Sequence, residues 1–554
     1  MRKFLPILTL FISLLLTHLA FSQATTSGIN GQITDVNGDP LTGATIIVIE
    51  TQTSSQYATV SDAKGFFYLP NMNPGGPYKL TATFVGFEPF VKEELYLTLG
   101  QTFRVNVQLS ESATELAGIV IVANKNDVFD GNRTGAETVI DKEKINAIPS
   151  ISGDLNDFTR LTPQASIIGD GISIAGSNNR YNSVMIDGTI NNDVFGLAAN
   201  GMNGGQTGIS AISYEAIDQF QVVIAPYDVR MSGFAGGGIN AVTKRGTNKF
   251  FGSAYFKYRN QGLAGKTPGE IDDGDTREKL ADFNAKTYGL TLGGPIIKDK
   301  LFFFVNAEFQ KDETPQPFSF SDYTGNSTEA DLNSLAGFYR EAYGYDPGGY
   351  LNNTRELNGT KILTRFDYNI NKNHKLMFRY QYVYGESVGP SSSNKNNIYF
   401  YNSGILFPST THTAAIELKS IFGSEYSNNL KLGFTSVNDD RNVMGDKFPG
   451  VTIKDGSGTI HLGGEVYSTG NQLKQNIFTL EDNFQIYKGN HVITVGTHNE
   501  FYDIYNMFMR RAYGDYTFDS LSGVLQGDLA SDYRIGYSLV DDIRGDGSKV
   551  CCRL

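Results

Sequence analysis

Residue types that indicate catalysis, metal binding or a disulfide framework are scarce in this sequence. Its 554 residues include no tryptophan, six histidines and two cysteines, adjacent at Cys551–Cys552. Neighbouring cysteines cannot join distant segments, so a disulfide framework is excluded. The histidines form no His-Glu-x-x-His pair, and the sequence contains no Gly-x-Ser-x-Gly motif. We therefore expect no metal, no cofactor and no enzymatic activity.

Basic residues are also in deficit. Lys and Arg number 46 against 58 Asp and Glu, a net charge of −12, which argues against nucleic-acid binding. With 40% hydrophobic and 19% charged residues, the chain is neither disordered nor typical of a helical membrane protein. What it has in excess is Gly (61), Phe (37) and Tyr (30), which favour β structure in more than one domain.

A long apolar run occurs only at the N-terminus. Basic residues at 2–3 precede the apolar stretch Phe4–Leu19, and small residues follow. This pattern predicts a secretory signal peptide over residues 1–22, cleaved between Ser22 and Gln23. A single membrane anchor is the alternative, but the stretch is short for one. No cysteine follows the run, which argues against a lipoprotein.

Turn signals recur through residues 28–110. Asn37–Pro40, Asp62–Gly65 and Pro74–Pro77 separate short β-rich runs, which predicts a small antiparallel β-sandwich. The order Gly-x-Ile-x-Asp, Pro-Leu-x-Gly-Ala, Asp-x-x-Gly-Phe-Phe and Tyr-x-Leu-x-Ala resembles the carboxypeptidase-regulatory-like domain, whose fold is related to carbohydrate-binding modules. The resemblance implies either sugar or partner binding at the loops, or a structural docking module, which we favour.

The stretch from residue 177 to 248 is rich in Gly and Asn and has almost no helical period. Its two motifs are Asn179–Asn182 with Ile186–Gly188, and Ala225–Arg230 with Gly233–Gly246. Asp187–Gly188 predicts a turn that ends a short strand. Glycines before the strand Ile239–Thr243 permit positive φ or the close approach of another surface. A segment this rich in glycine is unsuited to form a core of its own, which suggests that a larger structure surrounds it.

These motifs resemble the plug domain of TonB-dependent outer-membrane receptors, and more narrowly the Oar-like group. The matching positions are Arg180, Asp187, Gly188, Tyr227, Asp228, Arg230, Gly237, Asn240 and the strand Ile239–Lys244. The resemblance implies an α+β plug over residues 126–247, in which we expect short helices at Asp141–Ala147 and Gly153–Leu161. It also implies a location in the outer membrane of a Gram-negative cell.

Residues 111–125 form a linker with a β-prone segment. The segment includes Glu115, Leu116, Ile119, Val120, Ile121, Val122 and Ala123. It resembles a TonB box, the segment that pairs with the energy-coupling protein TonB, and β-branched residues suit addition to the edge of a partner's sheet. Gly118 stands where the family usually has an acidic residue. The alternative is that this segment is the first strand of the plug.

From Lys249 onward the hydrophobic pattern has period two. Ile362, Thr364, Phe366, Tyr368 and Ile370 share one face, and Lys361, Arg365, Asp367 and Asn369 share the other. Runs of about ten residues alternate between short turns and long polar connections, such as 311–358 and 437–475, which is typical of a transmembrane β-barrel. We expect an antiparallel barrel over residues 248–554. A soluble solenoid or sandwich would not expose so many aromatic residues.

The chain is therefore expected to be mainly β, with a small sandwich, an α+β plug and an incomplete barrel. The function that the resemblance implies is import of a nutrient, whether peptide, glycan or metal chelate. The expected partners are the TonB complex, outer-membrane lipid, the nutrient and, as a further candidate, a surface lipoprotein. The alternatives are a surface or adhesion protein that does not transport, and an inactive truncated receptor.

Two expectations concern particular residues. Arg180 and Asp187 should pack the plug in the barrel, because charged side chains suit a polar lumen.

The last stretch, residues 541–554, is not an amphipathic strand and lacks the terminal aromatic residue usual in the family. About ten strands can be placed where a barrel around a plug needs roughly 22. We therefore expect a truncated or frame-shifted product, which alone would not insert as a closed, heat-resistant barrel or transport.

Overall fold

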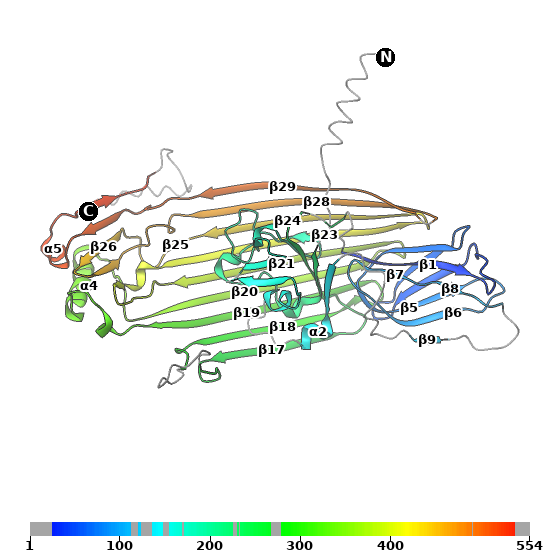
Figure 1. Cartoon of the computed structure of the whole chain (residues 1–554), viewed down its shortest axis with the longest axis horizontal. Helices are drawn as coiled ribbons and strands as arrows, with labels where there is room; N and C mark the ends of the chain where they lie inside the picture. The colour runs from blue at the N-terminus through cyan, green and yellow to red at the C-terminus, as the bar shows by residue number, and fades with distance from the viewer. Residues whose placement is uncertain are drawn as a thin grey trace, which may run out of the picture.

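A computed structural model describes residues 25–111, 120–122, 136–147, 155–168, 171–224, 230–231, 233–266, 279–489 and 491–537. They form a small two-sheet domain, a plug, and a wall of long strands with a folded unit at one end (Figure 1). The expected signal peptide and the two cysteines lie outside these residues. Within the described residues, no helix is long and apolar enough to cross a membrane.

The first domain consists of two packed sheets. Its strands are β1 Ser27–Thr34, β2 Thr45–Glu50, β3 Ser55–Val60, β4 Phe66–Met72, β5 Gly75–Thr83, β6 Phe90–Leu97, β7 Thr102–Arg104 and β8 Val107–Gln108. One sheet has the order β4-β1-β7, with β8 also on β1, and the other has the order β3-β2-β5-β6-β9, ending on β9 Val120–Val122. Alternate residues such as Ile46, Val48 and Leu80 fill the core between them. The expected antiparallel pairing holds only in part, because β7 and β8 pair parallel to β1.

The plug is a mixed sheet with short helices. Its elements are β10 Ala136–Asp141, α2 Lys142–Ala147, α3 Leu155–Thr159, β11 Ala165–Ile168, β12 Gly171–Ile174, β13 Ser183–Ile186, β14 Thr189–Ile190, β15 Ile217–Ile224 and β16 Gly237–Thr243, with 3-10 turns η1 Asn179–Tyr181, η2 Gly205–Thr207 and η3 Tyr214–Ala216. The sheet order is β10-β15-β16-β13-β14. Both helices lie where the sequence predicts them. Phe158, Phe220 and Ile239 lie in the plug core, which also includes Phe304 of the wall.

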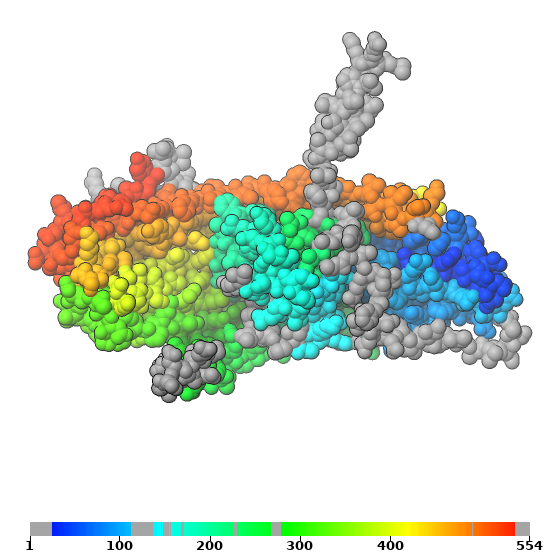
Figure 2. Space-filling model, viewed as in Figure 1, coloured from blue at the N-terminus to red at the C-terminus, as the bar shows by residue number. Residues whose placement is uncertain are grey.

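The wall is an open antiparallel sheet. Its long strands, in order, are β17 Phe251–Asn260, β18 Asn284–Ile297, β19 Leu301–Pro317, β20 Asn352–Asn369, β21 His374–Gly389, β23 Ile405–Phe422, β24 Tyr426–Asp440, β28 Gln472–Lys488 and β29 His491–Met507. A short strand, β25 Asn442–Val443, also pairs with β23. Short turns join these strands at one end of the wall, which we call the short-turn end. Figure 2 shows the plug, in cyan, against the wall, with the first domain, in blue, at that end.

The two faces of the wall differ as the alternation predicts. On neighbouring strands β20 and β21, Phe366 and Phe378 are 37% and 38% exposed and stack on the outer face, with ring centroids 6.4 Å apart. Arg365 and Arg379, next to them in sequence, are buried on the inner face. An aromatic outer face and a charged inner face suit a wall between lipid and a polar lumen.

The long connections at the opposite end are not polar loops, contrary to expectation. They form one folded unit, the cap, with α4 Glu329–Tyr343, α5 Leu521–Gln526, η4 Phe320–Asp322, η5 Tyr401–Ser403 and the strands β22 Asn397–Tyr399, β26 Gly450–Asp455, β27 Gly458–Leu462, β30 Asp515–Phe518 and β31 Asp532–Arg534. The sheet order is β22-β27-β26-β30-β31. Thr328 and Asp331 form a capping box that begins α4, and Leu332, Leu335 and Tyr339 follow on its buried face. The polar composition of the loops hid this core.

Phe448 connects α4 to the rest of the cap. It stacks on Tyr345 with centroids 4.1 Å apart and contacts Tyr339 edge-on at 5.8 Å. Phe448→Ala should destabilise the cap by about 3–5 kcal/mol because it removes a buried ring. Limited proteolysis in outer membranes should then cut the cap faster while the wall stays intact. Leu529→Ala, at a 96% exposed position, is the control. Equal resistance of the cap in both variants would contradict this account.

Candidate functional site

Inward-facing charges of the wall fall into two kinds of cross-strand pair. Glu308 lies opposite Lys361, and Lys431 lies opposite Glu481, each with a contact of 2.8 Å. These pairs are complementary within the wall. By contrast, Arg365 lies directly opposite Arg379 on β20 and β21. Like charges directly opposite one another destabilise a sheet, so this pair needs an anion from elsewhere.

Asp187 of the plug supplies that anion. It follows β13 in a two-residue turn to β14, and both turn residues have positive φ, 48° for Asp187 and 73° for Gly188. An Asp-Gly pair is typical of this hairpin turn, because both residues tolerate the left-handed region. The backbone N–H of Asp187 donates to Ala241 O at 2.9 Å, which fixes the turn against β16.

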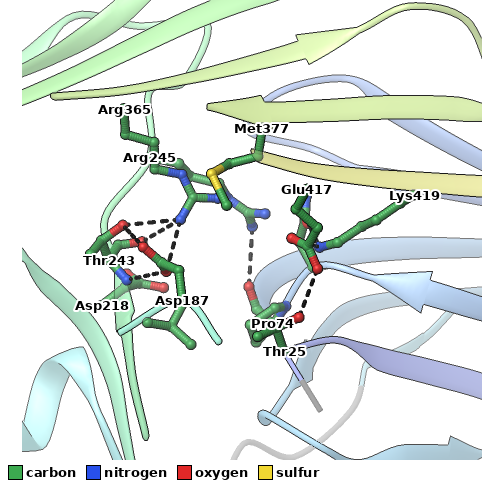
Figure 3. A pocket seen from close by; sticks show the side chains of 12 residues that line it. Thr25, Pro74, Asp187, Asp218, Thr243, Arg245, Arg365, Met377, Glu417 and Lys419 are labelled. Atoms are coloured by element: carbon green, nitrogen blue, oxygen red, sulfur yellow. Dashed lines mark hydrogen bonds and ion pairs between the residues drawn. The ribbon is translucent and has the colours of Figure 1, made fainter. Parts of the chain in front are cut away.

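The carboxylate of Asp187 contacts both arginines and the end of β16. Arg365 Nη1 lies 3.2 Å from Oδ1, and Arg379 Nε lies 3.5 Å from Oδ2. Thr243 donates to the same carboxylate from its backbone N at 2.9 Å and its hydroxyl at 2.8 Å. Figure 3 shows Asp187 and Thr243 side by side with Arg365 reaching toward them. We call Asp187, Thr243, Arg365 and Arg379 the plug–wall charge cluster.

Burial makes the cluster energetically important. Asp187 is 4% exposed, and Arg379 is completely buried. Arg365 also pairs with Asp367 at 2.8 Å, and Arg379 donates to the Thr189 hydroxyl. Removing one partner from a buried ion pair typically costs about 3–5 kcal/mol, because the remaining charge stays in a low-dielectric environment.

Further contacts hold the plug along the length of the wall. Near the middle, the Ser213 hydroxyl of the plug donates to Glu308 at 2.8 Å. Toward the cap, Gln206 donates to Asp439 at 2.7 Å, and Gln475 of the wall donates to Asp193 at 3.2 Å. Inside the plug, Lys244 pairs with Glu215 at 3.3 Å; burial nevertheless lowers the pKa of Lys244.

A second like-charge pair lies at the short-turn end. Lys375 and Lys419 are opposite each other on β21 and β23. Both contact the first domain: the Lys375 ammonium donates to Gln56 O at 3.1 Å and lies 3.9 Å from the centre of the Tyr57 ring. Lys419 donates to Asn73 Oδ1 at 2.9 Å and pairs with Glu417. The first domain thus supplies electron-rich groups to this pair, as the plug does to the arginines.

Arg180 does not lie where the sequence predicts. We expected Arg180 and Asp187 to act alike, but Arg180 is exposed in η1 and only Asp187 reaches the wall. The turn η1 precedes β13 and places Arg180 beside Gly196, where an added Cβ would lie 3.4 Å from Arg180 Nε.

The other motif positions divide into packing residues and residues outside the described ranges. A Cβ at Gly188 would collide with Thr25, and one at Gly237 would collide with Ile174. Asn240 is buried within β16. Arg230 lines a small cavity of about 70 Å³ between the first domain and the wall. Tyr227 and Asp228 lie outside the described residues.

The candidate TonB box is described only in part. Val120–Val122 forms strand β9, which pairs parallel to β6 with Val120 opposite Val91. Glu115, Leu116, Ile119 and Ala123 lie outside the described residues. The segment therefore has the β-strand tendency that its composition predicts, and here it extends a sheet of the first domain.

Two family models match this chain. The model for the carboxypeptidase regulatory-like domain matches residues 28–110, and that for the outer membrane beta barrel domain matches residues 242–349 and 326–541. The second match covers more than half of the chain. The chain belongs to the outer membrane β-barrel family. In this family, short turns lie at the periplasmic end of the barrel and long loops at the outer surface, which places the cap outside the cell.

Relatives of this outer-membrane protein are TonB-dependent. The TonB-dependent transporter Oar of Myxococcus xanthus is 30% identical over 307 residues, which are 52% of this chain and 27% of Oar. A probable TonB-dependent siderophore receptor, PirA of Acinetobacter baumannii, is 27% identical over 189 residues, 32% of this chain and 23% of PirA. The chain thus matches about a quarter of the length of these relatives.

The fold is also similar to a solved transporter structure. The outer membrane transporter YddB from Escherichia coli superposes with a TM-score of 0.50 at 14% identity, covering 72% of this chain and 51% of YddB. At this identity the likeness concerns the fold alone. The two family models confirm the carboxypeptidase-regulatory-like domain and the outer-membrane barrel that the sequence predicts, and the similarity to TonB-dependent relatives agrees with the resemblance seen in the plug motifs.

Sequence reasoning placed Arg365 on the inner face but missed its pairing with Arg379. The short turn at Asn371–Asn373 contained the signal. It fixes the register of β20 against β21, so that Asn369 lies opposite Lys375 and Arg365 opposite Arg379. Counting back from that turn predicts two arginines facing each other in the lumen, and thus a need for an acidic residue from the plug.

The cluster predicts that Asp187 and Arg180 differ in importance. Asp187→Ala should loosen the plug and increase entry of a large antibiotic such as vancomycin, because Arg379 would lose its buried counter-charge. The loss should be about 3–5 kcal/mol of plug–wall interaction. Arg180→Ala removes a charge from the same motif at an exposed position and should leave vancomycin sensitivity unchanged. Equal sensitivity of the two strains would refute the role assigned to Asp187.

Proposed function

We propose that this chain is part of a TonB-dependent receptor that, with its barrel closed, binds a nutrient at the outer surface and imports it. The observation that carries the proposal is the plug–wall charge cluster. In a closed barrel, a plug anchored by buried charges would obstruct the lumen, so solute would pass only when the plug changes position. Movement against several kcal/mol of contacts requires work, which an energy-coupling partner would supply.

The proposed ligand site lies between the cap and the outer end of the plug. There the loop after β14 exposes Val194, Phe195 and Leu197. Asp193 holds this loop: its carboxylate accepts from Ala198 N at 2.6 Å and from Gln475 of the wall. A rigid, partly apolar tip below a folded cap suits a ligand that has an apolar surface. One relative is named as a siderophore receptor, so ferric siderophores belong in a ligand screen beside peptides and glycans.

The proposed coupling segment is residues 115–123. The β9 pairing supports it: Val120–Val122 lies parallel to β6 at a sheet edge, and a β-strand can add to a partner's sheet through its backbone. TonB would bind the segment in the same way in the periplasm. A protein that only anchors an adhesive surface would have no need of such a segment.

Deletion of residues 115–123 should abolish uptake and leave surface binding intact. The physical reason is that the proposed ligand contacts lie at the cap and the plug tip, whereas the proposed pull by TonB acts on the linker. The measurement is accumulation and cell-surface binding of labelled ferric siderophores, peptides and glycans. A deletion of equal length, residues 267–275 between β17 and β18, serves as the control for chain shortening.

A TonB-deficient strain separates the proposal from the adhesion alternative. Uptake by the intact protein should cease in that strain, whereas adhesion should not depend on TonB. Unchanged uptake after the 115–123 deletion would reject this segment as the coupling site. Unchanged uptake in the TonB-deficient strain would reject energised import itself.

A further inference from the structure

A buried ion pair joins the first domain to the plug. Glu50, at the end of β2, is 1% exposed and pairs with Arg245 of the plug. Its second carboxylate oxygen accepts from the Thr53 hydroxyl at 2.9 Å, and Arg245 also donates to Pro74 O at 3.2 Å. Burial disfavours the charge on Arg245, but Glu50, with further contributions from Tyr78, Asp218 and Tyr57, raises the pKa of the guanidinium above its ordinary value.

This pair lies next to the plug–wall charge cluster. Arg245 follows Thr243 by two residues, and Thr243 bridges Asp187 and Arg365 at 2.8 and 3.1 Å. Figure 3 shows the two sides of this region, with Asp187 and Thr243 on one side and Thr25 and Pro74 of the N-terminal part on the other. The end of β16 is therefore held by the wall at one residue and by the first domain two residues later.

Main-chain groups also cross the boundary between the first domain and its neighbours. The Asn248 amide donates to Gln52 O at 2.9 Å. The Leu99 amide donates to Gln219 Oε1 of the plug at 3.2 Å, and Gln221 returns a hydrogen bond to Leu99 O at 3.1 Å. These amides are protected only while the first domain stays in place.

The same domain is fastened to the wall. Asn71 donates to Asn428 O at 3.1 Å, and Tyr68 stacks on Tyr487 with ring centroids 5.0 Å apart. Thr25, just before β1, donates to Glu417 at 2.7 Å. With the contacts of Lys375 and Lys419, the domain touches β21, β23, β24 and β28. It spans the gap between plug and wall at the periplasmic end.

We propose that the first domain is a lock, which fastens the plug to the wall at the periplasmic mouth and has to leave before the plug can move. This extends the proposed transport function and rests on it for its biological purpose. The contacts named above are mostly hydrogen bonds and ion pairs, with the Tyr68–Tyr487 stack and Ile421 of the wall as the apolar part. That composition suits a contact that opens and closes.

The coupling segment has a direct connection to this lock. Val120–Val122 pairs with Val91–Glu93 on the edge of β6. A pull on residues 120–122 therefore acts on a sheet of the first domain as well as on the plug that follows. The order of events would be release of the first domain, then displacement of the plug.

Hydrogen exchange tests the lock without any transported ligand. Glu50→Gln keeps the size of the side chain and removes the buried charge that pairs with Arg245. We expect exchange of the Asn248 and Leu99 amides to rise at least about tenfold in outer-membrane samples, since a buried pair is broken. Glu93→Gln makes the same change at a surface ion pair with Lys79, 2.7 Å long, and should leave both amides unchanged. Wild-type exchange at both amides in folded Glu50→Gln protein would overturn the proposal.

A reversible cross-link provides a second test that does not depend on Glu50. Vancomycin entry is measured in the Asp187→Ala protein, with Asn71→Cys and Asn428→Cys joined by a short reducible thiol cross-linker. Fixing the first domain to the wall should suppress the entry that Asp187→Ala causes, and reduction should restore it. Cross-linking Lys79→Cys to Glu93→Cys, within the domain, should suppress nothing. Undiminished entry at full Asn71–Asn428 cross-linking would refute the lock, whereas failure of TonB-dependent uptake alone would refute only the proposed transport.

Discussion

The structure depends on an electrostatic mismatch inside the wall. Arg365 and Arg379 face each other across β20 and β21, where two like charges in a poorly solvated interior repel. The wall cannot correct this alone, because Asp367 contacts only Arg365. The carboxylate of Asp187 enters between the two guanidinium groups and is itself held by Thr243. Plug and wall are therefore complementary in charge at this buried point, and each is electrostatically incomplete there without the other.

The same principle recurs one level closer to the periplasm, with weaker groups. Lys375 and Lys419 also face each other. The first domain contacts Lys375 with a backbone carbonyl and an aromatic ring, and Lys419 with an amide oxygen, rather than with a carboxylate. Uncharged partners give a weaker contact than the buried Asp187 provides. The plug is thus held strongly to the wall, and the first domain is held to the wall more weakly. The Glu50–Arg245 ion pair joins the first domain to the plug. Such grading suits stepwise opening by a pull from the periplasm.

The sequence predicts the architecture well, because each part has a strong local signal. Period-two alternation with aromatic residues identifies the wall, and Asp187–Gly188 identifies the turn that carries the key carboxylate. The sequence does not directly show contacts between residues that are far apart in the chain. The partner of Asp187 lies 178 residues away at Arg365, and that of Glu50 lies 195 residues away at Arg245. The cap was missed for another reason: its core residues come from several loops, none of which is apolar enough alone.

A double-mutant cycle tests the central claim most directly. Asp187→Asn, Arg379→Met and the double variant are compared by hydrogen exchange of β13 and β16 in the outer membrane. If Asp187 serves to neutralise the arginine pair, Asp187→Asn alone should accelerate exchange strongly. Adding Arg379→Met should recover part of the loss, with a coupling energy of about 1–3 kcal/mol, because Arg365 then keeps Asp367 and has no like charge opposite. Strictly additive effects of the two substitutions would contradict the account.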